Sequence, residues 1–395
     1  MMFTRARANV LVLALGQALF VVSATTLIFL GGLVGYALAS DKAYATLPVS
    51  CVVLGTALGT VPAALYMRRV GRRLGFFTGG GIGVVGSLIC AYGIFLSHFY
   101  LFCAGAFVVG VYNGFCQYYR FAAAETSDPA FKSKAISYVL AGGVLAALIG
   151  PELANHTKDV LAPITYLGSY LALACLAVLA MALALLIRMP PEAEGTAGGP
   201  SRPLPEIVRQ PLFIVAVLTS VLSYMVMSFM MTASPLAVIA CGYPVATAGF
   251  VIQWHVLGMF VPSFFTGHLI NRFGLVNIIT FGALLLLVCV GFALAGIEVV
   301  NFWAAMMLLG IGWNFMFVGA TSLLTEVYRP TERAKVQACN DFLVFASTAT
   351  ASLMSGQVIH YLGWQWVGLL SLPAIAIALA LVTWLRLMRR PPQPA

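Results

Sequence analysis

Twelve long apolar stretches dominate this 395-residue chain and constrain its fold more than any other feature. Each has about 20 to 30 residues, and about 20 helical residues are enough to cross the hydrocarbon core of a bilayer. Charged residues make up only 8% of the chain, against roughly a quarter in soluble proteins. We therefore predict an all-α integral membrane protein with twelve transmembrane helices, at residues 8–38, 43–67, 74–96, 98–124, 133–156, 162–188, 211–240, 244–270, 274–297, 301–327, 334–360 and 364–386.

Basic residues lie almost entirely on alternate loops of this bundle. With the N-terminus inside, the inner loops receive most of them, including four arginines within residues 68–73, whereas the outer loops receive only Lys42 and Lys158. Because cytoplasmic loops carry the excess of Lys and Arg, we expect both termini in the cytoplasm. The net charge of +9 then reflects this topology and an attraction to anionic membrane lipid. No basic patch interleaved with aromatic residues is present, so we expect no nucleic-acid partner.

A segment rich in Pro, Glu and Gly divides the chain into two parts with six predicted helices each. A weak internal repeat supports this division, because residues of the first part recur 201 positions later: Asn113, Glu125, Pro129, Lys132 and Lys134 correspond to Asn314, Glu326, Pro330, Arg333 and Lys335. The motif Arg69-Val70-Gly71 also returns as Arg272-Phe273-Gly274. We predict an N-terminal half (1–188), a cytoplasmic linker (189–210) and a C-terminal half (211–395), with the substrate path between the halves.

Two pairs of soft metal ligands lie on the seventh and eighth predicted helices: Met227 with Met231, and His255 with Met259. A spacing of four places both members of each pair on one helix face, and a turn near residue 243 places the pairs at similar depths. Three thioethers and an imidazole suit copper(I), whereas calcium and magnesium prefer oxygen ligands. We interpret the four residues as a metal site. In the alternative, the methionines pack as apolar side chains and the histidine bonds to a backbone carbonyl.

Three further residues are candidates for an accessory role at this site. Cys241 follows the seventh helix, where its thiol could meet an incoming ion or simply pack. Asp341 is the deepest acid in the predicted spans, and Asn314 lies in the tenth span beside Trp313. The eight cysteines show no paired spacing, so we expect no disulfide framework.

The two six-helix halves and the run Arg69-Val70-Gly71-Arg72-Arg73 resemble the major facilitator superfamily, whose loop between helices 2 and 3 carries Gly-x-x-x-Asp-Arg-x-Gly-Arg-Arg. The chain departs from that signature at Arg68 and Asn271, where the family has an acid. Within the superfamily, the two Met/His pairs and Gly312-Trp313-Asn314-Phe315 resemble the CcoA-like copper importers of bacterial inner membranes. The resemblance implies copper transport from periplasm to cytoplasm by alternating access, for delivery to a cytoplasmic copper chaperone and cytochrome oxidase assembly.

The same subgroup contains riboflavin carriers with similar seventh and eighth helices, so riboflavin or another small organic solute is the alternative substrate. Aromatic and amide residues of the fourth and tenth spans could stack a flat molecule: Tyr112, Asn113, Gln117, Tyr118, Trp313 and Asn314. We see no nucleophile with a base, no phosphate-binding loop and no catalytic-metal spacing, so we expect neither an enzyme nor a bound cofactor. We expect a monomer, because one such bundle can transport alone.

Overall fold

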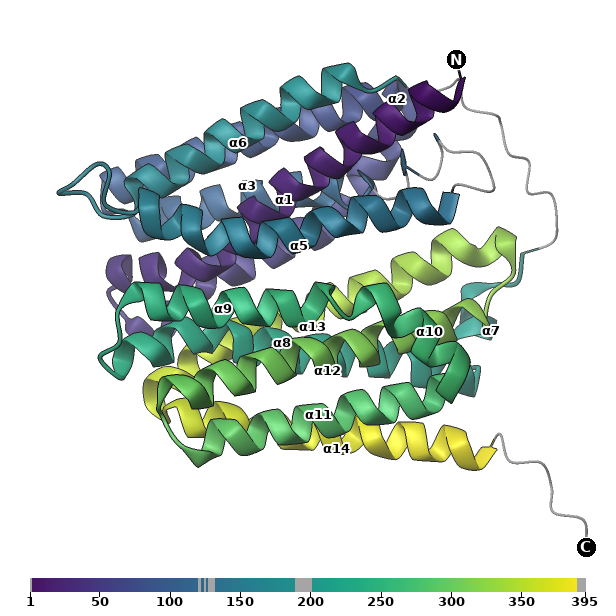
Figure 1. The fold of residues 1–395 in the computed structure, drawn as a ribbon. Helices are drawn as coiled ribbons and strands as arrows, with labels where there is room; N and C mark the ends of the chain where they lie inside the picture. The colour runs from purple at the N-terminus through teal and green to yellow at the C-terminus, as the bar shows by residue number, and fades with distance from the viewer. Residues whose placement is uncertain (1, 120–121, 124–125, 127–131, 189–200, 389–395) are drawn as a thin grey trace, which may run out of the picture.

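The computed structural model describes residues 2–119, 122–123, 126, 132–188 and 201–388, and the regular structure within these ranges is helical (Figure 1). The first half contains α1 (Met2–Leu38), η1 (Lys42–Tyr44), α2 (Leu47–Phe95), α3 (Phe99–Cys116), α5 (Lys132–Thr157) and α6 (Leu167–Leu186). The remainder contains α7 (Leu204–Val208), α8 (Pro211–Ala240), α9 (Val245–Phe260), α10 (Ser263–Phe273), α11 (Leu275–Ala295), α12 (Val299–Thr325), η2 (Pro330–Glu332), α13 (Arg333–Tyr361) and α14 (Trp364–Met388). Glu125 and Pro129 of the predicted repeat lie outside the described residues.

These helices account for the predicted membrane spans. Nine helices in the described ranges are long and apolar enough to cross a membrane, and α9 with α10 forms a further span. Helix α2 has 49 residues, far more than one crossing needs at about 1.5 Å per residue, and it covers the second and third predicted spans. Helix α5, with 26 residues, covers the fifth. The prediction of an all-α, twelve-span membrane protein is confirmed.

One glycine in each half reverses the chain between neighbouring spans. Gly71 interrupts α2 with φ 84° and ψ 162°, and Gly274 separates α10 from α11 with φ 84° and ψ 147°. Side chains with a Cβ atom rarely adopt this left-handed conformation, so glycine is required at both turns. Each glycine ends the repeated Arg-x-Gly motif. The sequence repeat therefore corresponds to a repeated backbone turn.

The eighth span is broken in the middle. Helices α9 and α10 meet at an angle of 44°, and Pro262 lies between them. Proline lacks the amide N–H that would continue the helical ladder, so a break at this position leaves carbonyl groups to be satisfied by other partners. The broken span places Met259 and Ser263 on either side of the bend.

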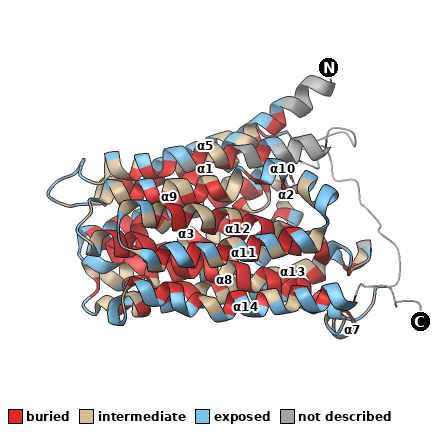
Figure 2. Cartoon of the chain, turned by 60° about the horizontal axis from the view of Figure 1, so that its bottom comes forward, coloured by how far each residue is buried: buried red, intermediate tan, exposed pale blue. Residues whose placement is uncertain are grey.

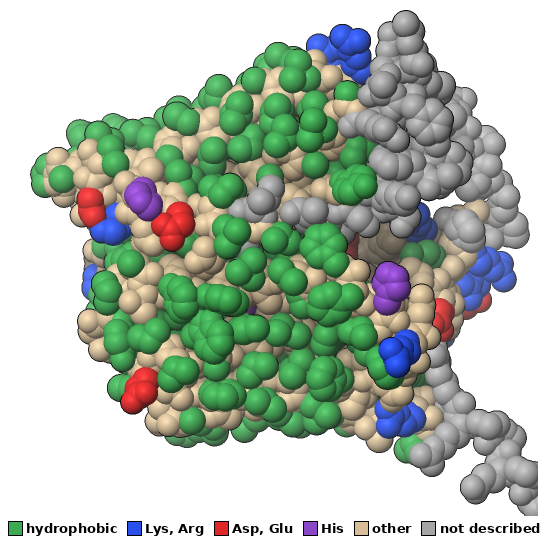
Figure 3. Space-filling model, viewed as in Figure 1, with side chains coloured by type: hydrophobic (Ala, Val, Ile, Leu, Met, Phe, Trp, Pro, Cys, Tyr) green, Lys and Arg blue, Asp and Glu red, His purple; other side chains and the backbone are tan. Residues whose placement is uncertain are grey.

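The helices form two bundles that lie side by side (Figure 1). Helices α1, α2, α3, α5 and α6 pack together in the first, and α8 to α14 pack together in the second. Between the bundles, α2 contacts α13 and α5 contacts α9. Helix α1 begins and α14 ends at the same end of the molecule (Figure 1). Buried residues concentrate inside the bundles (Figure 2), and apolar side chains cover much of the outer surface, as a lipid environment requires (Figure 3).

The two bundles contact each other at the end opposite the two termini. Thr46 Oγ1 donates a hydrogen bond to the Leu353 carbonyl at 3.3 Å, and a Cβ atom on Gly356 would lie only 2.4 Å from the same hydroxyl oxygen. On the other side of the interface, a Cβ atom on Gly249 would lie 2.9 Å from Asn155 Nδ2. Small residues at both places therefore permit close approach of the bundles at this end.

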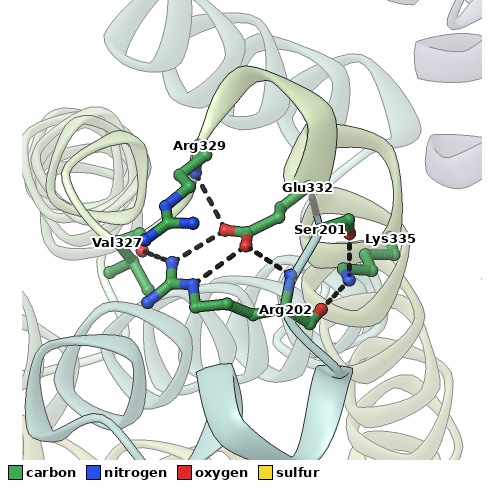
Figure 4. A network of polar contacts seen from close by, with 6 residues as sticks. All are labelled: Ser201, Arg202, Val327, Arg329, Glu332 and Lys335. Atoms are coloured by element: carbon green, nitrogen blue, oxygen red, sulfur yellow. Dashed lines mark hydrogen bonds and ion pairs between the residues drawn. The ribbon is translucent and has the colours of Figure 1, made fainter. Parts of the chain in front are cut away.

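The described part of the predicted linker is anchored to the second bundle (Figure 4). The Arg202 amide, Nε and Nη2 donate hydrogen bonds to the buried Glu332 carboxylate at 2.8, 2.9 and 2.7 Å, and the Arg329 amide adds a fourth at 3.0 Å. Lys335 Nζ donates to Ser201 Oγ at 2.6 Å and also to the Arg202 carbonyl. The hydrogen bonds from the Arg202 side chain hold the pKa of the Glu332 carboxyl well below its usual range.

Candidate functional site: a cavity between the two bundles

A cavity of about 450 Å³ lies between the two bundles, within the range of about 300 to 1,000 Å³ that is typical of small-molecule sites. Helices α1, α2 and α3 line it from the first bundle, and α8, α9, α10, α12 and α13 line it from the second. The lining reaches from Val49, near the start of α2 and close to the contact at Thr46, past the middle of the helices to Gln17 of α1 and Val318 of α12, which lie in the halves nearer the termini. The contacts between the bundles lie at the opposite end.

Four aromatic residues of the second bundle whose rings contact one another form one wall of the cavity: Tyr224, Trp313, Phe317 and Phe345. We call this set the ring wall. Phe260 and Phe264 of the same bundle and Phe20 of the first also line the cavity. The Trp313 and Phe317 rings are stacked at 5.2 Å with an interplanar angle of 11°. The Tyr224 ring meets them edge-on at 5.0 and 4.8 Å, and meets the Phe345 ring at 6.4 Å. Aromatic clusters of this kind present a flat apolar surface suited to a planar ring system.

The opposite wall comes from the first bundle and carries amides and hydroxyls: Gln17, Thr25, Thr56, Asn113 and Gln117. We call this set the polar wall. Asn113 is only 5% exposed, and within the described chain its amide oxygen has no hydrogen-bond partner. Thr56 donates to the Val52 carbonyl at 2.9 Å, so its oxygen can still accept a hydrogen bond. The ring wall thus lies on one side of the cavity and three side-chain amides lie on the other, although Phe20 of the first bundle and hydroxyl residues of the second also line it.

The predicted Met/His site is only partly assembled. Met227, Met231 and Met259 line the cavity, as the four-residue spacing of the first pair predicted. His255 is not among the described lining residues. Its side chain is fully buried, and Nδ1 bonds to the Met306 carbonyl of α12 at 2.9 Å, the arrangement that the sequence left open as the alternative. Its Nε2 atom is buried without a partner in the described structure.

Asn314 supports the broken span. Its Nδ2 donates to the Met259 carbonyl at 2.7 Å and to Ser263 Oγ at 2.5 Å, and its Oδ1 accepts from Thr266 Oγ1 at 2.7 Å. Met259 lies before the bend, and the other two partners lie after it. One buried amide thereby joins α9 to α10, so most of its hydrogen-bonding capacity is already used by the protein.

The other two accessory candidates lie apart from the cavity. Cys241 caps the C-terminus of α8 and is partly buried. Asp341 is partly buried on α13, and its Oδ1 accepts a hydrogen bond from Asn340 Nδ2 at 3.1 Å. Neither residue is among the described residues that line the cavity.

The cavity lining carries no ionised groups. Among the described lining residues there is no Lys, Arg, His, Asp or Glu. Across the described chain, His, Cys, Asp and Glu side chains form no group of three or more that could hold a metal ion. An uncharged lining of this kind suits a neutral ligand, because a charged one would lose its hydration without gaining a counter-charge.

The aromatic and amide residues singled out from the sequence are mostly in the cavity. Asn113, Gln117, Trp313 and Asn314 line it. Tyr112 instead packs against Gly83, whose added Cβ would lie 2.8 Å from the ring. The Tyr118 hydroxyl donates to the Thr60 carbonyl at 3.0 Å.

Several residues that line the cavity were not identified from the sequence: Gln17, Thr25, Thr56, Tyr224, Phe317 and Phe345. Helical spacing could have identified two of them. Phe317 follows Trp313 by four residues and Tyr224 precedes Met227 by three, so each shares a helix face with a residue that was recognised. Phe345 follows Asp341 by four residues, but Asp341 is not among the described residues that line the cavity. The other three have no proposed site residue at a spacing of three or four.

Comparison with known proteins identifies relatives over nearly the whole chain. The Major Facilitator Superfamily sequence model matches residues 13–290 and 221–395. Riboflavin transporter RfnT of Brucella anthropi is 44% identical over 381 residues, which cover 95% of each chain. The uncharacterised transporter YdeG of Bacillus subtilis is 29% identical, over 90% of this chain and 86% of its own. A bacterial homologue of the human lysosomal transporter Spinster, solved in an inward-facing, unoccupied conformation, has the same fold, with a TM-score of 0.73, 14% identity and 96% coverage of each chain.

These relatives overturn the prediction of copper import. The 44% identical relative is a riboflavin transporter, so copper as the cargo and a copper chaperone as the acceptor are wrong. The physical reason for the error is that three cavity methionines contribute soft apolar surface just as well as they would ligate an ion, and the fourth proposed ligand is bonded to a backbone carbonyl. The fold and the sequence matches agree on the family: this chain belongs to the Major Facilitator Superfamily.

Proposed function

We propose that this chain transports riboflavin across the bacterial inner membrane. The observation that carries the proposal is the 44% identity to a riboflavin transporter over 95% of both chains. The cavity supports it, because the ring wall offers a flat surface for an isoalloxazine ring and the uncharged lining suits a neutral vitamin. Met227, Met231 and Met259 then serve as polarisable contacts to the ring instead of as metal ligands.

Transport follows from alternating access by the two halves, residues 1–188 and 211–395, with residues 189–210 between them. From the distribution of Lys and Arg, we infer that both termini lie in the cytoplasm. In that orientation the contacts between α2 and α13 and between α5 and α9 lie on the periplasmic side, and the cavity extends toward the cytoplasm. Separation of the bundles at the periplasmic end, with approach at the other, would expose the cavity to the opposite side.

The proposal is tested by uptake of labelled riboflavin into a bacterial riboflavin auxotroph that lacks its own importer. Expression of the wild-type chain should restore growth at low external riboflavin and should give saturable uptake. Trp313→Ala, in the ring wall, should reduce uptake by about tenfold or more, because stacking on an aromatic side chain contributes about 1 to 3 kcal/mol.

Trp384→Ala is the matched control, because Trp384 is 42% exposed on α14 and is not among the described lining residues. It should transport at the wild-type rate. Wild-type chain that reaches the membrane in normal amounts but takes up no riboflavin would refute the proposed function.

A further inference from the structure

We propose that riboflavin lies across the two bundles in one orientation, with its isoalloxazine ring on the ring wall and its ribityl chain on the polar wall, and that the site excludes phosphorylated flavins. The inference rests on the proposed function and adds the binding pose and the selectivity to it. It predicts which residues recognise which part of the vitamin.

The unequal chemistry of the two walls carries the orientation. Riboflavin has a flat, largely apolar ring system at one end and a flexible chain of hydroxyl groups at the other. The stacked and edge-on rings of Tyr224, Trp313 and Phe317 all come from the second bundle. The side-chain amides of Gln17, Gln117 and Asn113 come from the first. The second bundle also contributes hydroxyls to the lining, but these are already hydrogen-bonded within the protein: Ser228, Thr232, Ser263 and Thr348. The ring system therefore finds its stacking surface on one wall, and the ribityl chain finds its available amides on the other.

The repeated asparagines show why the polar wall is available to a ligand. Asn113 and Asn314 occupy equivalent positions in the internal repeat. Asn314 donates two hydrogen bonds and accepts one within the protein. Asn113 is almost as buried, yet its Oδ1 has no partner in the described chain. A buried amide oxygen without a partner is unfavourable, and rotation of the amide toward the cavity would let a ribityl hydroxyl donate to it.

The expected selectivity for riboflavin over phosphorylated flavins rests on the absence of charged side chains among the described lining residues. Flavin mononucleotide differs from riboflavin by a phosphate at the end of the ribityl chain, which this pose places against the polar wall. Neutral amides and hydroxyls can bond to a phosphate but supply no positive charge to offset its desolvation. We expect the wild-type chain to bind flavin mononucleotide at least about a hundredfold more weakly than riboflavin.

The pose is tested with riboflavin and lumichrome, an alloxazine that has the same three fused rings but no ribityl chain. Purified full-length chain in nanodiscs is titrated with each, and quenching of flavin fluorescence reports the Kd. Trp313→Ala should weaken both ligands by a similar factor, about 10-fold to 100-fold. Asn113→Ala and Gln117→Ala should each weaken riboflavin binding by about 3-fold to 10-fold and leave the Kd for lumichrome unchanged.

The two amide variants carry their own folding check, because Asn113→Ala and Gln117→Ala should retain lumichrome binding. Trp384→Ala and Gln365→Ala, both exposed and not among the described lining residues, should bind both ligands like wild type. Equal loss of riboflavin and lumichrome in the amide variants would overturn the pose, as would normal binding by Trp313→Ala. If the wild-type chain binds neither ligand, the proposed function itself fails.

Selectivity is tested in the same assay with flavin mononucleotide. Gln117→Lys introduces a cation on the polar wall. It should reduce the ratio of the Kd for flavin mononucleotide to the Kd for riboflavin by about tenfold or more. Wild-type binding of flavin mononucleotide within about threefold of riboflavin would overturn the exclusion. If Gln117→Lys leaves this ratio of Kd values unchanged while riboflavin still binds, the lack of positive charge is not the cause of the exclusion.

Discussion

Asn314 shows how a single side chain can hold a broken helix in place. The break at Pro262 removes part of the helical hydrogen-bond ladder of the eighth span, and the amide of Asn314 replaces it with bonds to residues on both sides of the bend. Since Met259 and Ser263 also line the cavity, the same amide fixes the position of two lining residues.

Replacement of Asn314 by alanine should therefore destabilise the protein. The Met259 carbonyl and the Ser263 hydroxyl would lose a buried partner, at a cost of about 1 to 3 kcal/mol. Equilibrium unfolding in mixed SDS micelles measures this change. Asn277→Ala, at an exposed asparagine that bonds to the Phe273 carbonyl, provides the control and should change stability by less than about 0.5 kcal/mol. Equal stability of the two variants would contradict the structural role of Asn314.

At the residue scale, helix geometry predicts which side chains share a face, but the neighbouring helices decide what that face contacts. The spacing of Met227 and Met231 correctly predicts that both point the same way, and both line the cavity. His255 was expected to face them. It bonds instead to the Met306 carbonyl of α12, a contact that no spacing within α9 could reveal.

At the helix turns formed by Gly71 and Gly274, glycine is needed only for its backbone conformation. A Cβ atom added at either position would meet nothing within 4 Å, so any cost of substitution comes from the positive φ angle and not from a clash. Such strain costs about 1 to 3 kcal/mol.

Gly274→Ala should destabilise the protein by that amount, whereas Gly267→Ala should not. Gly267 lies within α10, also has nothing within 4 Å of an added Cβ, and has an ordinary φ angle, so alanine there should be neutral or stabilise by up to about 1 kcal/mol. Thermal unfolding of the two variants in the same detergent makes the comparison. A destabilised Gly267→Ala with an unaffected Gly274→Ala would contradict the explanation.

The anchor between Arg202 and Glu332 is the second element with a measurable consequence. Glu332→Ala removes the acceptor of three Arg202 hydrogen bonds and should expose the linker to protease. Tryptic cleavage after Arg209, the neighbouring linker site that no proline follows, should become about tenfold faster or more. Glu206→Ala, at an exposed acid of α7, should leave the cleavage rate close to that of wild type. Cleavage at equal rates in all three proteins would show that the anchor does not restrain the linker.

The same anchor predicts a pH dependence. Because the pKa of Glu332 is lowered in the folded protein, its contribution to stability is fully present above the unfolded value of about 4.3 and is lost as the pH falls from there through the lowered value. The difference in melting temperature between wild type and Glu332→Gln should therefore stay constant from pH 8 to about pH 5.5 and shrink toward pH 3. A difference that grows on acidification would have the wrong sign for this mechanism.

For the whole molecule, the contact between the bundles at Gly356 should control which end is open. A leucine at this position would overlap with Thr46 Oγ1, which lies 2.4 Å from an added Cβ, and would keep the bundles apart at this end. Gly356→Leu should reduce riboflavin uptake to about a tenth of wild type or less. Gly291→Leu, on the exposed face of α11 with open space around it, is the control.

The substitution Val49→Cys reports the conformation directly, because Val49 lines the cavity. It is made after the eight natural cysteines are replaced by serine. With Gly356→Leu, an impermeant thiol reagent added from outside should label the introduced cysteine faster than in the parent chain. Unchanged labelling together with normal uptake would show that this contact does not close the outer end.

Hydropathy and the internal repeat suffice to predict the fold, because membrane spans are long and each must satisfy its own backbone. Even the equivalence of Gly71 and Gly274 follows from a repeated motif. The cargo could not be predicted in the same way. Methionines such as Met227 fit both a soft ion and a flat ring, and the aromatic residues that distinguish the two cases come from separate helices, α8, α12 and α13, that only the folded chain brings together.

The uncharged cavity also has an electrical consequence. The membrane potential does about 2.3 kcal/mol of work on each elementary charge per 100 mV, and a neutral vitamin held among neutral side chains presents no charge for that work. On the proposed function, the voltage therefore does no work on riboflavin itself in this cavity. The driving force that the vitamin itself would contribute is then its concentration difference, which a cell can maintain by phosphorylating riboflavin after entry, into the form that the proposed pose excludes.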